Sequence, residues 1–190
     1  IGSFERTMRS SIEQLNNDPS RFKCRNFEED LRELIADHAN AETFERALKD
    51  LSYTSDKKAI RFLLAMDEYT CAWFEDGAQG RPDFRTPDQA IDLSQITLEH
   101  ISAQNAEDVD SDMQPLLHTI GNLTLLAEGE NDRARNRPFD DKREIFKASN
   151  LRMNLKLGEQ ADWNAEKAIE RQTSIIEQAI RVFSLDHNQQ

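Results

Sequence analysis

The segment His118-Thr-Ile-Gly-Asn-Leu-Thr-Leu-Leu126 constrains the fold of this chain more than any other stretch. Its Gly-Asn pair is a turn signal, and the aliphatic and β-branched residues that follow predict a strand. Another short strand is predicted upstream, where Ile96 and Leu98 lie on one face and the pair Glu99-His100 comes directly after them. We therefore expect a small sheet with polar groups gathered at its strand ends.

A helix is predicted to follow the second strand. Pro138 is well placed for a first helical turn, and Phe139, Ile145 and Phe146 form an apolar stripe at helical spacing. The order strand, strand, helix, with polar groups at the junctions, is a compact frame for a site that holds one metal ion.

The rest of the chain is predicted to be mainly helical, which makes the fold class mainly α (α+β). Apolar residues at helical spacing predict helices over residues 4–15, 26–38, 41–52, 55–74 and 163–184. Residues 154–159 are expected to form a short link, and Trp163 is expected to anchor the core. We expect an N-terminal helical region over 1–78, a linker loop rich in Gly, Pro and Asp over 79–94, and a core with a C-terminal helix over 95–190.

Length and composition narrow the class of protein. A chain of 190 residues allows one large domain or two small ones, and no apolar run approaches the roughly 20 residues of a membrane span. No secretory signal is visible. Cys24 and Cys71 lie far apart and form no Cys-x-x-Cys pair. We expect a reduced cytoplasmic protein without a structural zinc, although the sequence leaves a disulfide between the two cysteines open.

The charge is unevenly distributed along the chain. The formal net charge of −12 argues against a nonspecific coat on nucleic acid. Residues 131–156 nevertheless hold eight basic side chains against four acidic ones. This positive segment coincides with the helix predicted after the second strand, and it is either a nucleic-acid surface or an ordinary exposed helix of mixed charge.

These motifs together resemble a known family. The order Glu99-His-Ile, then His118-x-Ile-Gly-Asn-Leu-Thr-Leu-Leu, then Asn131-x4-Asn136-x2-Phe139-x2-Lys142, is similar to the C-terminal nuclease domain of GmrSD-type restriction enzymes and of SspE-like phosphorothioate-dependent defence proteins. That family looks like a branch of the HNH (ββα-metal) nucleases. The resemblance implies a ββα-metal core with a two-stranded antiparallel sheet. One departure is Ala103, where the family often has proline.

The resemblance also implies a role for each site residue. His100 resembles the general base, and Glu99 resembles the first metal ligand. Asn122 resembles the central asparagine that tethers the loop and helps to orient the histidine. Asn131 looks like the metal ligand on the helix, with Asn136 as the alternative. The implied cofactor is Mg²⁺ or Mn²⁺, which takes oxygen ligands and keeps several waters.

Basic residues of the same segment are candidates for contact with DNA. The residues expected to bind DNA are Arg133, Arg135, Asn136 and Lys142. His118 is ambiguous, since it could touch the site or only support the second strand.

The resulting functional hypothesis is a metal-dependent DNA endonuclease, cutting one strand or both, in a prokaryotic defence system against phage. The resemblance implies products with 5′-phosphate and 3′-hydroxyl ends. It also implies an N-terminal NTP-dependent sensor domain of the same full-length protein, since relatives of this type usually carry one and Ile1 looks like an internal start. These 190 residues hold no Gly-rich phosphate loop, so we expect them to hydrolyse no nucleotide. The alternative is an HNH-like module that binds DNA or a partner without cutting.

Overall fold

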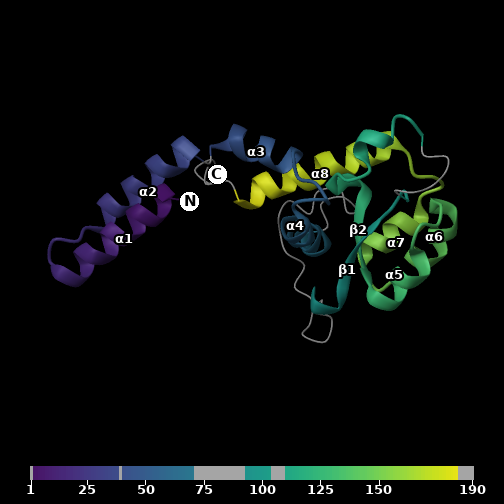
Figure 1. The fold of residues 1–190 in the computed structure, drawn as a ribbon, viewed down its shortest axis with the longest axis horizontal. Helices are drawn as coiled ribbons and strands as arrows, with labels where there is room; N and C mark the ends of the chain where they lie inside the picture. The colour runs from purple at the N-terminus through teal and green to yellow at the C-terminus, as the bar shows by residue number, and fades with distance from the viewer. Residues whose placement is uncertain (1, 39, 71–92, 104–109, 184–190) are drawn as a thin grey trace. The chain divides into compact units, whose positions relative to one another are not determined.

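The computed structural model of the chain describes residues 2–38, 40–70, 93–103 and 110–183 (Figure 1). The chain divides into two compact units, Ile1–Ala47 and Leu48–Gln190. The division falls inside the helix α3 (Ala41–Lys49). The linker loop predicted over 79–94 lies almost entirely outside the described residues, as does the end of the helix predicted over 55–74.

The first unit is built on a helical hairpin. Helix α1 (Gly2–Asn17) packs against α2 (Cys24–His38), and both confirm helices predicted from apolar spacing. Neither helix has a fully buried residue. Apolar side chains such as Met8 and Leu34 are only half-buried, so the hairpin is stabilised by partial burial of two amphipathic faces.

The second unit holds the sheet, which has two antiparallel strands as predicted. Strand β1 (Ile96–His100) pairs with β2 (Leu123–Ala127), with Ile96 opposite Ala127 and His100 opposite Leu123. Strand β2 is buried along four of its five residues, which explains its continuous run of Leu and Thr.

Helices surround this sheet. They are α4 (Lys57–Thr70), α5 (Glu128–Ala134), α6 (Phe139–Lys147), α7 (Arg152–Glu159) and α8 (Ala165–Phe183). Short 3-10 helices cover Leu93–Gln95, Gln114–Leu116 and Ile120–Asn122. The mainly α, α+β fold class is therefore confirmed. In the part of the chain that the structure describes, no helix is long and apolar enough to cross a membrane.

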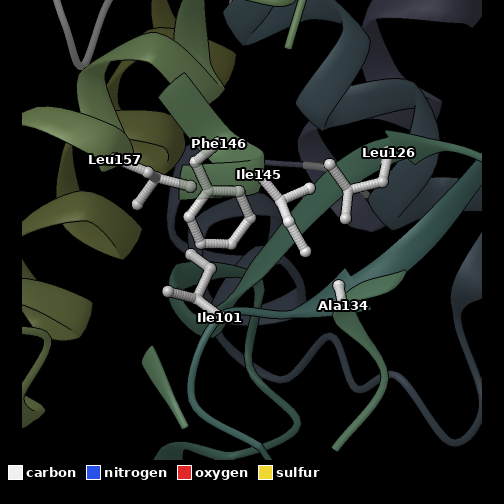
Figure 2. Packing of buried hydrophobic residues seen from close by; sticks show 6 residues of the cluster. All are labelled: Ile101, Leu126, Ala134, Ile145, Phe146 and Leu157. Carbon is white, nitrogen blue, oxygen red and sulfur yellow. The ribbon is translucent and has the colours of Figure 1, made fainter. Parts of the chain in front are cut away.

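The core of the second unit joins the sheet to the helices that follow it. Figure 2 shows the side chains of its main cluster: Ile101, Leu126, Ala134, Ile145, Phe146 and Leu157. Trp163 packs against this cluster and stacks on Phe139 at 6.1 Å between ring centroids. The predicted apolar stripe of α6 and the predicted anchoring role of Trp163 are both confirmed.

The prediction of a short link over residues 154–159 was wrong, because these residues belong to α7. The helix is stabilised by a distant side chain that local sequence does not show. Both carboxylate oxygens of the buried Glu68, on α4, accept backbone N–H groups of the first turn, from Arg152 and Met153, each at 2.9 Å. An anionic group at a helix N-terminus satisfies donors that the helix cannot pair itself.

Gly121 marks the closest approach of α8 to the turn that precedes β2. A Cβ atom on residue 121 would overlap the Ala168 carbonyl oxygen and would lie 2.9 Å from the Gln172 Cβ atom. Glycine is required here because the helix backbone occupies the space of a side chain.

Replacing Gly121 with alanine should therefore destabilise the protein by about 1–3 kcal/mol or more, since α8 must move to admit the methyl group. Gly129→Ala is the matched control. Gly129 lies within the helix α5, and a methyl group added to it would have no other atom within 4 Å. That change should be neutral or stabilising by about 0.5–1 kcal/mol. Urea unfolding followed by tryptophan fluorescence measures both, and equal stability of the two variants would contradict the packing argument.

Candidate functional site

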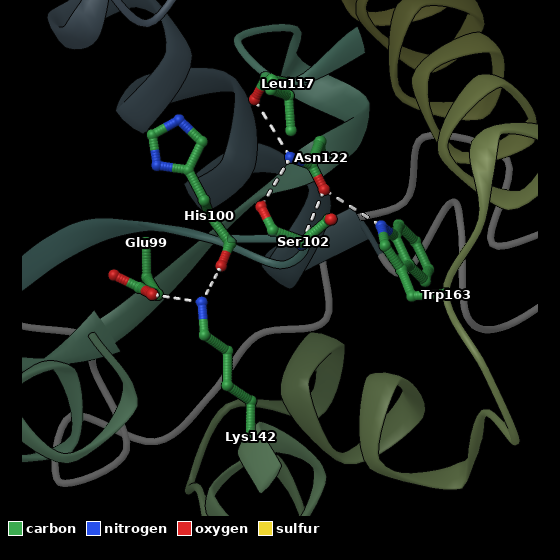
Figure 3. A network of polar contacts seen from close by, with 7 residues as sticks. All are labelled: Glu99, His100, Ser102, Leu117, Asn122, Lys142 and Trp163. Carbon is green, nitrogen blue, oxygen red and sulfur yellow. Dashed lines mark hydrogen bonds and ion pairs between the residues drawn. The ribbon is translucent and has the colours of Figure 1, made fainter. Parts of the chain in front are cut away.

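The last two residues of β1, Glu99 and His100, form the centre of the candidate site. Each residue is 8% exposed. The strand pairing stays regular through His100, so the two side chains leave the strand in different directions, as Figure 3 shows. The end of β1 thus presents a carboxylate on one side and an imidazole on the other.

Glu99 is paired with Lys142 of α6, which lies completely buried beneath the strand. The Lys142 Nζ atom donates to Glu99 Oε1 at 2.6 Å and to the His100 carbonyl oxygen at 2.5 Å. Burial raises the pKa of the Glu99 carboxyl in spite of the opposing effect of Lys142. Burial likewise lowers the pKa of the Lys142 ammonium in spite of Glu99. The sequence predicted a phosphate contact for Lys142, but the structure places its ammonium in the interior.

Asn122 holds the chain that leaves β1. Its Oδ1 atom accepts the Ser102 backbone N–H at 2.9 Å and the Trp163 Nε1–H at 3.0 Å. Its Nδ2 atom donates to the carbonyl oxygens of Ser102, at 3.2 Å, and Leu117, at 3.0 Å (Figure 3). All the hydrogen-bonding capacity of this fully buried amide is used to join the segment after β1, the turn before β2 and the segment before α8.

His118 lies directly against His100. The Nε2 atom of His100 and the Nδ1 atom of His118 are 3.2 Å apart. Tyr53, which precedes α4, packs on both: its ring centroid lies 4.5 Å from that of His100 and 6.0 Å from that of His118. The Tyr53 backbone N–H also donates to the His118 carbonyl oxygen at 2.8 Å. The sequence left open whether His118 touches the site or only supports the second strand. In the structure it lies beside His100.

The surroundings of His100 favour its neutral form. Burial is the main cause that lowers its pKa, to about 4, and the electrostatic effects of His118, Lys142 and Lys57 add to it in that order. A neutral imidazole has a lone pair with which to accept a proton, so His100 can act as a base at neutral pH.

The other predicted site residues lie on α5 and in the turn after it. Asn131 is half-buried on α5, and that helix packs on β1, whereas Asn136 is exposed in the turn. Arg133 and Arg135 are exposed as well. Arg135 has a φ of 38°, which is rare for a residue with a side chain and turns the chain sharply between α5 and α6.

The donor atoms suit a hard cation. Within the described residues, no group of three or more His, Cys, Asp and Glu side chains is arranged to hold a metal ion. The Lys142 ammonium is paired with Glu99 Oε1, so Oε2 is the oxygen of this carboxylate that remains to bind a cation. The carboxylate of Glu99 and the amide of Asn131 carry oxygen atoms of the kind that Mg²⁺ and Mn²⁺ bind, and such ions take most of their other ligands from water and substrate phosphate.

Sequence reasoning missed Tyr53, Lys57 and the burial of Lys142. A signal for Lys142 was present, since it lies three residues after Phe139 and three before Ile145, on the apolar stripe of α6. No comparable signal exists for Tyr53, because only the tertiary fold brings it to the histidines.

A comparison with known protein families assigns the chain to one of them. Residues 38–178 match the model of the GmrSD restriction endonucleases, C-terminal domain. The chain belongs to this family. A GmrSD C-terminal domain is a nuclease domain of the restriction endonuclease type, with DNA as its substrate. No curated protein matches the chain.

The buried His100 should make the stability of this GmrSD domain depend on pH. Unfolded histidine takes up a proton near pH 6.5, whereas folded His100 resists protonation to about pH 4. In EDTA, the free energy of unfolding should therefore be fully retained above about pH 6.5 and fall as the pH drops towards 4, by up to a few kcal/mol.

Chemical unfolding at a series of pH values between 4 and 7 measures this dependence. His100→Phe should flatten it within this window, while the exposed His38→Phe should leave it unchanged. A slope unaffected by His100→Phe would show that other groups control acid stability.

Proposed function

We propose that this domain hydrolyses phosphodiester bonds in DNA as a ββα-metal (HNH-type) nuclease, with His100 as general base and one divalent cation. The observation that carries the proposal is the His100–His118 pair beside Glu99 at the end of β1. The order of β1, β2 and the following helix, with Asn122 tethering the segment after β1, supports the same assignment.

The base step requires one tautomer of His100. If the His100 Nε2–H donates to His118 Nδ1, the Nδ1 lone pair of His100 is left to take a proton from the attacking water. When His100 gains this proton, the hydrogen bond to His118 becomes charge-assisted and stabilises the imidazolium. Lys142 fixes the strand end by bonding the His100 carbonyl oxygen.

Glu99 and Asn131 would hold the cation. A bound Mg²⁺ or Mn²⁺ supplies positive charge that stabilises the phosphate and the leaving oxygen. Glu99 offers Oε2, and α5 presents Asn131 from its packed position beside β1. Asn136, exposed in the next turn, is the less suitable ligand because a solvated amide is less rigidly placed.

Basic residues around the turn between α5 and α6 would bind the DNA backbone. Arg133, Arg135 and Arg137 are all exposed, and Asn136 lies between the last two. Exposed guanidinium groups contact phosphates through charge-assisted hydrogen bonds. This surface replaces Lys142 as the predicted DNA contact.

The wider context follows from the family. We propose a role in restriction of phage DNA in the cytoplasm, with target choice made by an NTP-dependent sensor domain of the same full-length protein. Phosphorothioate-modified DNA is the modification to test first, because of the SspE-like motifs. Incubation with supercoiled plasmid, with and without Mg²⁺ or Mn²⁺, distinguishes a nick, a double-strand break and no cleavage.

His100→Ala should reduce plasmid cleavage about 10²–10⁴-fold, because it removes the proton acceptor. DNA binding should stay within a few-fold, since phosphate contacts dominate affinity and lie elsewhere. Cleavage and gel-shift assays at one fixed salt concentration test both. His38→Ala, in the first unit, is the matched control. Persistent cleavage by His100→Ala would move the base to His118, and a wild-type protein that binds but never cuts would favour the binding-module alternative.

Replacing Arg133, Arg135 and Arg137 together with alanine should weaken DNA binding and reduce the slope of log affinity against log salt by up to about three. The matched control replaces three exposed arginines of the first unit, Arg6, Arg9 and Arg32, with the same change in charge. Fluorescence anisotropy with a labelled duplex at several salt concentrations measures the slopes. Equal salt-dependence slopes for the two triple variants would show that the α5–α6 turn does not contact DNA.

A further inference from the structure

Two residues outside the recognised motifs complete the surroundings of the histidine pair. Tyr53 lies just before α4 and contacts both His100 and His118 through its ring. Lys57 is the first residue of α4, and its Nζ atom lies 4.2 Å from the centroid of the Tyr53 ring. An aromatic face attracts an ammonium group at this distance, so the Tyr53 ring holds the charge of Lys57 near the imidazoles.

Lys57 has properties that Lys142 lacks. Its side chain is exposed, whereas Lys142 is completely buried and bonded to Glu99 and the His100 carbonyl oxygen. Within the described part of the chain, the Lys57 ammonium lies against the ring of Tyr53 and not against a carboxylate. In the described residues its ammonium is thus exposed and not joined to a carboxylate by an ion pair, so it can receive an anionic ligand from solvent.

An anionic ligand at the histidine pair would need such a cation. Among the residues that the structure describes, the cations outside the histidine pair whose charges act on His100 are the buried Lys142 and the exposed Lys57. A phosphodiester that approaches the pair brings a negative charge into a half-buried aromatic and imidazole surface, where an uncompensated charge is unfavourable. A lysine ammonium is a compact phosphate-binding group on a flexible stem.

We propose that Lys57 is the phosphate-binding cation of the His100 site, held over the ring of Tyr53, and that it contacts the phosphodiester that is cut. This assignment rests on the proposed nuclease function. It deepens that function by adding α4, which precedes every recognised motif, to the catalytic surface. Tyr53 is a positioning residue in this scheme, since it acts through Lys57 and the two imidazoles.

The chain supplies a matched control for Lys57. Lys58 is the next residue on α4, is exposed and carries the same charge, but neighbouring helical residues point about 100° apart. The test uses the full chain with Lys57→Ala, Lys58→Ala and Lys57→Arg, with circular dichroism to confirm folding. Kinetics of cleavage of a plasmid in Mg²⁺ or Mn²⁺ provide the first measurement.

Lys57→Ala should lower kcat/KM about 10- to 100-fold, the loss expected for one charge-assisted hydrogen bond to phosphate. Lys58→Ala should stay within about two-fold of wild type, and Lys57→Arg should restore most of the loss. If wild type cleaves and Lys57→Ala cleaves as well as Lys58→Ala, the assignment of Lys57 is wrong while the nuclease function stands.

Binding of inorganic phosphate gives a second measurement that needs no cleavage. Phosphate should shift the imidazole proton resonances of His100 and His118 in wild type and in Lys58→Ala, and bind about tenfold or more weakly to Lys57→Ala. If wild type does not cleave at all, the nuclease function fails and this titration decides on Lys57 alone. Equal phosphate affinity of Lys57→Ala and Lys58→Ala would overturn the proposal.

Discussion

The second unit depends on one buried arginine. Arg171 of α8 is fully buried, and its Nη1 atom donates to the carbonyl oxygens of Ile120, Gly121 and Leu123, at 3.2, 3.1 and 2.6 Å. Burial lowers its pKa to about 10, with the charge of Asp67 on α4 opposing the shift, so it stays protonated at neutral pH. A permanent cation thus fixes the turn that presents Asn122, and Asn122 in turn fixes the segment after β1.

The end of β1 has a structural contact on one side and the candidate base on the other. On one side, Lys142 bonds Glu99 and the His100 carbonyl oxygen and anchors the strand to α6. On the other side, His100 faces His118 and Tyr53, where a proton can be accepted. The proposed metal ligand and the proposed base are neighbours in sequence, with Cα atoms about 3.8 Å apart. Because their side chains leave the strand in different directions, one phosphodiester would have to lie at the strand end itself to reach both.

Local pattern was enough to predict both strands and the α6 stripe, because each is a property of neighbouring residues. The family motif added Asn122, whose tethering bonds the structure contains. What could not be predicted depends on contacts between distant segments. Glu68 stabilises α7 from 84 residues away, and Tyr53 reaches the histidines only through the tertiary fold. Lys142 was expected to contact DNA because it is basic, whereas its position on the apolar stripe of α6 agrees with the buried site that it occupies.

Buried charged side chains recur in the second unit. Lys142, Arg171 and Glu68 each occupy a stripe position that an apolar residue would normally fill. A buried charge contributes little net stability, because its desolvation offsets most of the attraction, but it is costly to leave unpaired. An apolar side chain in the same place could fill the space, but its contacts would not be directional. Instead, Lys142 binds backbone atoms of the strand end, Arg171 binds those of the turn before β2, and Glu68 binds those of the first turn of α7. We infer that these buried charges set the relative positions of the segments that carry the site. Hydrophobic packing alone would not do so, because it is not directional.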